Sequence, residues 1–597
     1  MLSVFVFHLN RNWLPGGFVG VDVFFVISGY LITSIIYREC QLGSFTLAKF
    51  YQRRIARIFP AFFTVAVATL VGARLAYATE DFAGAGASLV AAALSVANLT
   101  FIRQGNYFKL TPDGQPYLHY WSLSVEEQFY IFFPLLFILL YKYARKRQAI
   151  ILAGLASFSF IACVLLVQRK PVACFYLLPT RAWELLAGCL LAVLSGRESC
   201  LPGKGRAWQW LSLGGLCLVV LSFFAVREGP HFPGFWTLLP VLGAVGVLLP
   251  YAGTEAFSEK WLAVAPLALI GRLSYSLYLW HWPIFSFIDY QFCLTSNLVR
   301  LTLKIGLSAG LTALSFWLIE KPARAFLNRP ANRPWAYSMM VCALAVCVSL
   351  GIVVKRAYYA SPTAKDVANG GLVFAPSRSV GSVVLMGDSN GSMYGNALRE
   401  ICGKMGCRLT LLGVDGGDPL PFADPAHHQL WFDSLAVVKK EKPDLLIFAC
   451  TWQSKLKGNM GRLALAVQTL TRSAGHVALL NQPPILPPNA SRAALREGAR
   501  PPFFEDPTNH ALRLEANEYL QRFDFDRASV VDIASHFETS AGEIRFLNQQ
   551  DRGLYHDPSH LSGFGVDAVR PELERVIAQF AGAQKQASDK TLAAPAP

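Results

Sequence analysis

The chain has 597 residues, of which 53% are hydrophobic and only 16% are charged. A soluble protein of this size carries more charge, so the composition excludes an ordinary soluble protein and indicates a polytopic membrane protein with several domains. Residues 1–357 hold 30 Lys and Arg against 14 Asp and Glu, whereas residues 358–597 hold 24 against 25. The second part lacks a basic patch interleaved with aromatic residues, which argues against nucleic-acid binding.

Apolar segments follow one another through the first part of the chain, at residues 19–38, 58–78, 87–102, 124–143, 149–168, 181–195, 207–226, 235–253, 266–288, 298–319 and 336–354. The opening stretch MLSVFVFHLN is also apolar, but ten helical residues rise only about 15 Å, half of a bilayer core. It lacks the charged region and cleavage site of a signal peptide. Two expectations stay open for it: a half-helix, or the end of a span that starts upstream.

Four basic clusters orient these segments, because Lys and Arg are enriched in cytoplasmic loops. They lie at residues 49–57, 142–147, 197–206 and 321–333. All four can be cytoplasmic only if one segment between residues 79 and 123 does not cross, and the polar segment 87–102 is therefore expected to be a re-entrant or interfacial helix. About eleven spans then remain, and the last, a linking helix at residues 334–357, delivers the rest of the chain to the outside.

Charged and polar side chains inside lipid spans are costly, so each is a candidate for function. His8 lies in the opening stretch, and Asp22 lies in GGFVGVDVFFVISGYLIT, whose glycines permit close helix packing. Arg54 and Arg57 are three residues apart on one helix face at the cytoplasmic edge. Two adjacent guanidinium groups bind phosphates well, although plain anchoring by positive charge is the alternative.

Three later motifs contain further candidates. They supply Glu126 and Glu127 in YWSLSVEEQFYIFFP, Arg181 and Glu184 in LPTRAWELLAG, and Arg272, Tyr275, Tyr278 and His281 in IGRLSYSLYLWHWPIF. Acidic residues suit the N-terminus of a helix, which explains the place of the two glutamates. The aromatic residues of the third motif also fit an interfacial belt.

These motifs, together with RRIAR and WLIEKPAR, resemble the acyltransferase-3 membrane family in order over a domain at residues 1–333. The resemblance implies an acetyl-CoA donor on the cytoplasmic side, with His8 as the base that handles the acyl group and Arg54 and Arg57 near the CoA phosphates. Related proteins usually begin with an Asp-Gly-Leu-Arg-like stretch before this histidine. Its absence favours the expectation of a shortened N-terminus.

From about Tyr358 the pattern changes to short β-like runs that alternate with helix-compatible stretches. This alternation predicts a three-layer α/β domain with a parallel sheet at residues 379–582. Residues 358–378 are expected to form a linker, and residues 583–597 a disordered tail. Cys402 and Cys407 are open to two interpretations, a disulfide in an oxidising compartment or burial as small apolar residues. No cysteine spacing indicates a metal site.

The stretch VVLMGDSNGSMYG places Ser389 directly after a predicted strand and before a predicted helix, at the sheet edge where open α/β folds bind ligands. Far downstream, DPSHLSGFG contains Asp557 and His560. A serine hydroxyl needs a base within hydrogen-bond reach, and the base needs an acceptor that orients it. An aspartate three residues before the histidine supplies that acceptor from one turn. The sequence therefore predicts a Ser-His-Asp site.

This second domain resembles the SGNH hydrolase family over about 200 residues, which implies Ser389 as nucleophile, His560 as base and Asp557 as its partner. The second block of the family supplies a glycine N–H to the oxyanion hole, and LLGVDGGDPLP offers Gly416 or Gly417. The third block is usually Gly-x-Asn-Asp, whereas this chain has IFACTWQSK, in which Gln453 is the candidate donor.

The fusion of the two domains resembles bacterial O-acetyltransferases of surface polysaccharide. It implies a multi-pass inner-membrane protein, surrounded by membrane lipids, that moves acetyl from cytoplasmic acetyl-CoA to a surface polysaccharide or lipid-linked glycan outside. Lipopolysaccharide O-antigen or lipooligosaccharide core is the favoured acceptor, and peptidoglycan is the alternative. Two other hypotheses stay open: an esterase that removes acyl groups from envelope glycans, and a transporter of acylated lipid with a glycan-binding domain.

Overall fold

The computed structural model describes residues 1–103, 114–196, 206–249, 261–358, 361–422, 428–456, 458–487 and 489–580. The chain divides into two compact units. The helical unit comprises Met1–Tyr77, Gly84–Phe292 and Ser296–Val353, and the α/β unit comprises Ala78–Ala83, Cys293–Thr295 and Val354–Pro597.

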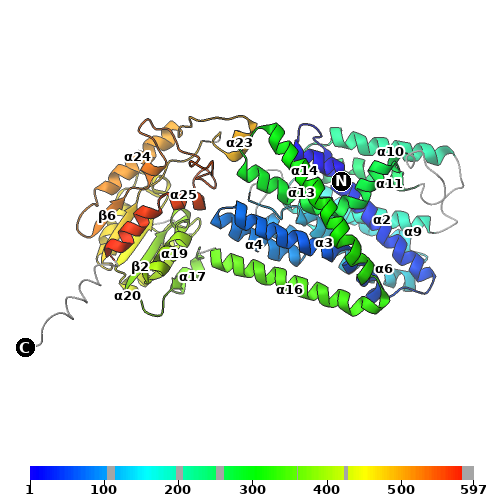
Figure 1. The fold of residues 1–597 in the computed structure, drawn as a ribbon, viewed down its shortest axis with the longest axis horizontal. Coiled ribbons are helices and arrows are strands. Elements are labelled where there is room, and N and C mark those ends of the chain that lie inside the picture. Colours follow the sequence, from blue (N-terminus) through cyan, green and yellow to red (C-terminus); the bar gives the residue numbers. More distant parts are fainter. Residues whose placement is uncertain are drawn as a thin grey trace, which may run out of the picture. The chain divides into compact units, whose positions relative to one another are not determined.

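The described residues up to Tyr358 form helices (Figure 1). Their bounds are α1 (Leu2–Leu9), η1 (Gly17–Val19), α2 (Gly20–Gln41), α3 (Leu47–Ala76), α4 (Thr79–Ala93), α5 (Ala97–Ile102), α6 (Tyr120–Tyr143), α7 (Gln148–Val167), α8 (Pro171–Tyr176), α9 (Leu178–Ser195), α10 (Arg206–Ala225), η2 (Gly234–Thr237), α11 (Leu238–Leu248), α13 (Ala265–Gln291), α14 (Asn297–Ser315), η4 (Phe316–Glu320), α15 (Lys321–Leu327), η5 (Pro330–Asn332) and α16 (Arg333–Tyr358).

Seven helices within the described ranges are long and apolar enough to cross a membrane, judged by length and composition. They are Gly17–Gln41, Leu47–Ala76, Tyr120–Tyr143, Gln148–Val167, Pro171–Ser195, Asn297–Leu327 and Pro330–Tyr358. Two shorter apolar helices, Gln209–Ala225 and Gly234–Leu248, accompany them. The predicted fold class, a helical membrane domain followed by an α/β domain, is confirmed, whereas the number of eleven spans stays a prediction.

The segment 87–102 is divided between two helices, although the sequence predicted one. Helix α4 ends at Ala93 and α5 begins at Ala97, and between them Ser95 adopts the left-handed conformation with φ of 54°. The 15 residues of α4 rise about 22 Å, which is less than the thickness of a bilayer core. This length fits the prediction of a helix that does not cross.

Helices α2 and α9 pack so closely that glycine is required at their contact. A Cβ atom added to Gly29 would lie 1.9 Å from the carbonyl oxygen of Leu185, and one added to Gly188 would lie 2.0 Å from that of Val26. Both obstructing atoms belong to the backbone, so neither can rotate away. The glycines of the motifs ISGYLI and WELLAG therefore set the distance between these two helices, as the sequence predicted for the first of them.

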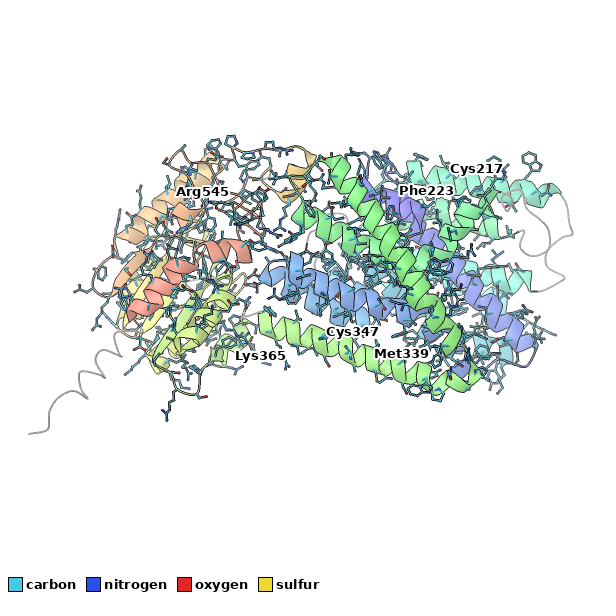
Figure 2. All side chains as sticks on the ribbon, in the orientation of Figure 1. Cys217, Phe223, Met339, Cys347, Lys365 and Arg545 are labelled. Atoms are coloured by element: carbon cyan, nitrogen blue, oxygen red, sulfur yellow. The ribbon has the colours of Figure 1, made fainter. Side chains whose placement is uncertain are left out.

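The expected linking helix is present as α16. Near its start, Ala336 and Met339 pack against Ile55 and Ala56 of α3 and Leu327 of α15 (Figure 2 labels Met339). This apolar cluster joins α16 to the helical unit, so that the helix leading to the second domain is part of the bundle.

The α/β unit contains a six-stranded sheet with helices around it (Figure 1). The bounds are α17 (Ala364–Ala368), β1 (Leu372–Phe374), β2 (Gly381–Gly387), α18 (Ser389–Ser392), α19 (Gly395–Met405), β3 (Cys407–Gly413), α20 (His428–Glu441), β4 (Leu445–Ala449), α21 (Trp452–Leu456), α22 (Gly461–Thr471), β5 (His476–Leu480), α23 (Arg492–Glu497), α24 (Pro507–Gln521), β6 (Ala528–Val531), η6 (Ala534–His536) and α25 (Gly563–Ala568).

The strand order is β1-β3-β2-β4-β5-β6, and all neighbours are parallel except β1, which pairs with β3 in the antiparallel sense. The segment expected as a linker, residues 358–378, thus contributes α17 and β1 to the domain. A three-residue strand is too short to stand out as an apolar β-like run, which is how the other five strands were predicted.

Side chains alternate between two cores along each buried strand, as the period of an extended chain requires. In β2, Val383 and Leu385 belong to the core that includes α19, whereas Val384 and Met386 belong to the core that includes α20 and α22. The sheet is therefore covered on both faces, which is the predicted three-layer arrangement. Cys402 and Cys407 are buried free thiols in the first core, so the structure follows the packing interpretation for them.

Candidate active site

The strand order changes direction at the carboxyl ends of β2 and β4. The chain leaves β2 toward β3 on one side and leaves β4 toward β5 on the other, and ligands of open α/β sheets bind where this direction changes. Ser389 follows β2 after one residue, and the stretch Thr451 to Gln453 follows β4. The predicted nucleophile and one predicted oxyanion donor thus come from adjacent strands of the same edge.

The turn that presents Ser389 is held by Asp388, a buried carboxylate at the N-terminus of α18. Its Oδ1 accepts the N–H of Asn390 at 2.8 Å, and its Oδ2 accepts the N–H of Thr451 at 3.0 Å. Burial raises the pKa of Asp388, and these two N–H groups act against that rise. Asp388 therefore ties the end of β2 to the end of β4.

Gly387 allows these two strand ends to approach each other. A Cβ atom at this position would lie 2.0 Å from the carbonyl oxygen of Ala449, the last residue of β4. The Gly-Asp-Ser sequence thus combines the space for a close approach, the carboxylate that holds the two strand ends together and the hydroxyl of the predicted nucleophile.

The base is presented by a tight turn between Tyr555 and Leu561, which form an isolated antiparallel bridge. Within it, the N–H of His556 donates to the carbonyl oxygen of His560 at 2.8 Å. Asp557 Oδ1 accepts the backbone N–H groups of Ser559 and His560 at 2.8 and 3.0 Å. The aspartate therefore shapes the turn with one oxygen and keeps the other for the imidazole.

The three predicted residues form one hydrogen-bonded chain, although 171 positions separate Ser389 from His560. The imidazole Nδ1 of His560 lies 2.7 Å from Oδ2 of Asp557, and its Nε2 lies 2.7 Å from Oγ of Ser389. A carboxylate only accepts, so Nδ1 of His560 carries the proton and Nε2 of the neutral ring accepts the serine hydroxyl. This is the arrangement that activates a serine nucleophile.

The electrostatics of the chain suit a general base. The hydrogen bond to Asp557 raises the pKa of His560, against burial, which lowers it. Burial acts to raise the pKa of Asp557, but the hydrogen bond and charge of His560 and the N–H of Ser559 outweigh it and hold this pKa below its usual range. The aspartate therefore stays ionised and stabilises the imidazolium that forms when His560 accepts a proton.

A second loop supports the turn of the base. The Tyr555 hydroxyl donates to the carbonyl oxygen of Pro484 at 2.9 Å, and the N–H of Leu486 donates to the carbonyl oxygen of Pro558 at 2.8 Å. The loop is itself held by Glu505, whose Oε1 accepts the N–H of Ile485 at 2.9 Å. The position of His560 is thus set through backbone contacts rather than by its own side chain alone.

The oxyanion candidates differ in how their N–H groups are used. The N–H of Gly417 donates to the carbonyl oxygen of Val414 at 3.0 Å, which engages it within the turn after β3. Gly416 precedes it in the left-handed conformation, with φ of 71°. The backbone N–H of Gln453 donates to Oε1 of Gln482 at 3.0 Å, while its side-chain oxygen is buried without a hydrogen-bond partner in the described part of the chain.

A cavity of about 650 Å³ lies in the helical unit. Its lining includes six predicted residues of the membrane motifs, Arg54, Arg57, Glu126, Glu127, Tyr275 and Tyr278, together with Ser28, Tyr130 and Phe223. Phe223, which Figure 2 labels, comes from α10. The cavity thus brings both arginines and both glutamates to one space.

Polar groups of the cavity are connected to one another. Oε1 of Glu126 accepts the hydroxyls of Ser28 and Tyr130, and the guanidinium of Arg54 lies 4.8 Å from the centroid of the Tyr130 ring. Arg53, the neighbour of Arg54, instead forms a bidentate pair with Glu39 at 2.6 and 2.8 Å. Arg54 and Arg57 therefore face the cavity, while the charge of Arg53 is already paired.

His8 and His281 form a pair of their own and do not line this cavity. Nδ1 of His8 lies 3.2 Å from Nε2 of His281. A third histidine, His119, lies with its ring centroid 5.8 Å from that of His281. His119 was not among the residues predicted from the sequence, although it directly precedes the motif that contains the two glutamates.

Asp22, Arg181 and Glu184 form a buried ion cluster between α2 and α9. Arg181 lies 2.9 Å from Oδ1 of Asp22 and 2.9 Å from Oε1 of Glu184. It also faces the rings of Phe25, Trp121, Phe175 and Phe232. These three motif residues thus join helices to one another and do not line the cavity. Arg272, on α13, is exposed and is not a lining residue, although its neighbour Gly271 is.

Two family models match the chain. One, described as an acyltransferase domain, matches residues 1–354, and the other, described as an SGNH domain fused to AT3 domains, matches residues 359–575. Among solved structures, the periplasmic domain of the lipopolysaccharide acetyltransferase of Salmonella ser. Paratyphi A aligns with 36% of this chain and 90% of its own, with a TM-score of 0.30 and 13% identity.

Curated relatives are similar over more than half of the chain. The peptidoglycan O-acetyltransferase OatA of Listeria monocytogenes is 30% identical over 345 residues, and the O-acetyltransferase OatA of Staphylococcus aureus is 30% identical over 342 residues. The alignments cover 55% and 54% of this chain and 55% of each relative, so the chain spans about half the length of the relatives it matches. Because the first family model matches more than half of its residues, the chain belongs to the acyltransferase-3 family, with an SGNH domain joined to it.

Proposed function

We propose that this protein is an O-acetyltransferase that moves an acetyl group from cytoplasmic acetyl-CoA across the membrane to a hydroxyl of an envelope glycan. The observation that carries the proposal is the hydrogen-bonded chain of Ser389, His560 and Asp557 in a protein whose other unit belongs to a membrane acyltransferase family. Acetyl-CoA is large, anionic and cytoplasmic, whereas envelope glycans are completed outside. The chemistry is therefore divided between the two units.

The helical unit takes the acetyl group from acetyl-CoA. Its cavity of about 650 Å³ has the size of a ligand pocket, and Arg54 and Arg57 in its wall suit the phosphates of the donor. His8, which the family resemblance identifies as the base that handles the acyl group, lies outside the lining. We therefore place donor binding in the cavity and proton transfer at His8.

The SGNH domain transfers the acetyl group to the sugar. Oγ of Ser389 bonds to the acetyl carbon while Nε2 of His560 takes the hydroxyl proton, and the group that held the acetyl leaves with that proton. A sugar hydroxyl then bonds to the acetyl carbon of the acetyl-serine and gives its proton to His560. The bond to Oγ breaks, and Ser389 recovers its proton from His560, so that the enzyme returns to its starting state.

The developing oxyanion needs N–H donors that are not already engaged. The N–H of Gly417 is bonded to Val414, so we infer that Gly416, the residue before it, is the glycine donor. Gln453 lies near the start of α21, which follows the adjacent strand β4. It supplies the second donor from its side-chain amide. This assignment replaces the asparagine that the SGNH family usually has at that block.

The test compares Ser389→Ala with Ser535→Ala, a control that changes an exposed serine of the same unit. Cells that lack the chain receive each variant, and mass spectrometry measures acetate esters on their lipopolysaccharide and peptidoglycan. We expect Ser389→Ala to lower acetylation of one glycan by about a thousandfold or more, because the nucleophile is removed, and the control to keep it. The affected glycan identifies the acceptor, since one relative is named as a peptidoglycan O-acetyltransferase while lipopolysaccharide is the favoured prediction.

Two outcomes would contradict the proposal. Normal acetylation with Ser389→Ala removes the serine from the pathway. Higher acetylation in cells without the chain, together with release of free acetate from an added acetylated oligosaccharide, identifies an esterase instead, because water and sugar compete for the same acetyl-serine.

A further inference from the structure

The pair of histidines in the helical unit is anchored at one end by the backbone. Nδ1 of His281, on α13, lies 2.7 Å from the carbonyl oxygen of Tyr278, and Nε2 of the same ring lies 3.2 Å from Nδ1 of His8, on α1. The two ring planes are 13° apart, and their centroids are separated by 5.3 Å. His281 is fully buried. The two nitrogens of His281 therefore have different and fixed partners.

These contacts determine which nitrogen carries the proton in each ring. A carbonyl oxygen only accepts, so Nδ1 of His281 must be the protonated nitrogen. The neutral ring then has its lone pair on Nε2, and the bond to His8 requires that Nδ1 of His8 donates. A neutral His8 consequently has its own lone pair on Nε2, the atom that can accept a proton.

The orientation of the His8 ring is limited by a further neighbour. The ring of Trp282 meets it edge-on with centroids 4.7 Å apart, and Nε1 of Trp282 donates to the carbonyl oxygen of Gln115 at 2.8 Å. The tryptophan is thus held in place by its own hydrogen bond. His8 is confined on one side by this ring and on another by the acceptor nitrogen of His281.

We propose that His281 is a positioning residue for His8, which fixes the tautomer and the orientation of the His8 ring so that Nε2 is its proton acceptor. The proposal rests on the proposed function, in which His8 is the base of the helical unit. The role proposed for His281 is the same as that of Asp557 in the serine site, which fixes the tautomer of His560. In the helical unit a backbone carbonyl and a second imidazole take the place of the carboxylate.

The experiment uses the full chain in membranes and measures the release of CoA from acetyl-CoA, as kcat and KM. In His281→Phe the ring volume stays but the acceptor for Nδ1 of His8 is lost. We expect kcat to fall by about tenfold or more with KM for acetyl-CoA unchanged, because His8 then populates the wrong tautomer. In His281→Gln the side-chain oxygen can accept the same proton, and kcat should recover to within about fivefold of the unmodified chain.

Phe285→Leu is the matched control. Phe285 stands one turn further along α13 and also packs against α1, where its ring centroid lies 5.2 Å from that of Phe5, but it offers no acceptor. We expect its kcat to stay within about twofold of the unmodified chain, since the side chain stays apolar and no hydrogen-bonding group is lost. Equal rates for His281→Phe and His281→Gln, or a loss as large in the control, would overturn the proposal.

His8→Ala separates this inference from the proposed function. If His8→Ala releases CoA at the normal rate, His8 is not the base, and the part of the proposed function that places proton transfer at His8 fails. If His8→Ala is slow while His281→Phe is normal, only the positioning role fails. Adding His281→Phe to His8→Ala should cause no further loss, because a residue that acts through His8 has no effect without it; a second tenfold loss would show a separate structural role.

Discussion

The imidazole of His560 must be neutral to accept the proton of Ser389, and Asp557 raises its pKa above the ordinary value of about 6.5. We therefore expect kcat/KM for acetyl transfer to fall as pH drops through this raised pKa and to level off above it. In Asp557→Asn the carboxylate charge is lost, so the midpoint should move to lower pH. The plateau should also fall by about a thousandfold, because the tautomer of His560 is no longer fixed.

The control for this pH profile is Asp567→Asn. Asp567 lies on α25 in the same unit and pairs with Arg570 at 2.7 Å rather than with the catalytic histidine. It removes the same charge from the domain, and we expect its midpoint to stay at the value of the unmodified chain. An Asp557→Asn profile with an unmoved midpoint, or an equal shift in both variants, would show that Asp557 does not set the pKa of His560.

The contact between α2 and α9 depends on its glycines more than on any side chain. In Gly29→Ala the added Cβ would lie 1.9 Å from the carbonyl oxygen of Leu185, so the helices must separate and the ion cluster of Asp22 and Arg181 opens with them. Overpacking costs about 1–3 kcal/mol in general, and a backbone obstacle places this variant at the upper end. A lower melting temperature of the purified protein in detergent measures the effect.

Gly154→Ala provides the comparison for that measurement. A Cβ atom at Gly154 on α7 meets no atom within 4 Å, so no steric cost arises. Alanine is also a better helix former than glycine by about 1 kcal/mol, and the variant should be as stable as the unmodified chain or more so. If both variants melt alike, close packing of α2 on α9 is not what these glycines provide.

The division of chemistry between the two units requires the SGNH domain to face the outside. Lys404, exposed on α19, and Lys146, exposed between α6 and α7, lie in the two regions that the charge pattern assigns to opposite sides. In intact cells we expect Lys404→Cys, but not Lys146→Cys, to react with a membrane-impermeant maleimide, read by mass spectrometry of the labelled peptide. Permeabilised cells should label both.

The reverse labelling pattern would contradict the proposal that the chemistry is divided between the two sides of the membrane. Labelling of Lys146→Cys alone in intact cells would place the serine site in the cytoplasm, together with the donor. Transfer of acetyl to an external glycan would then need another protein. The same experiment is independent of activity, so an inactive preparation still reports the topology.

Much of the fold was predictable because it depends on local patterns. Five of the six strands coincide with short apolar runs, and the predicted strand Ser382–Met386 lies within β2. The predicted helix at residues 395–405 is α19 itself. The strand β1 was missed because three residues contain too little pattern, and its pairing with β3 is a tertiary contact. Helix lengths alone do not settle how many spans cross the membrane.

The roles of polar residues in the helical unit needed the structure. In sequence, Asp22, Arg54 and Glu126 are equally costly polar residues in apolar surroundings. In the fold, Arg54 and Glu126 line the cavity, whereas Asp22 forms a buried ion pair with Arg181, which is 159 positions away in the sequence. Ser28 and Tyr130 were not predicted as site residues. Hydroxyl side chains are common in membrane spans, and only the tertiary structure shows which group such a hydroxyl contacts.

Sequence was sufficient to predict the apolar helices, the change to an α/β domain and the set of Ser389, Asp557 and His560, because hydrophobic periodicity and short motifs are local properties of the chain. Tertiary structure alone decided that Gly417 is engaged by Val414, that Arg54 faces a cavity while Arg53 is paired, and that His281 orients His8. Each of these three findings depends on contacts between residues of different elements or on the path of a turn. The order of residues in the sequence does not reveal such contacts or such a path.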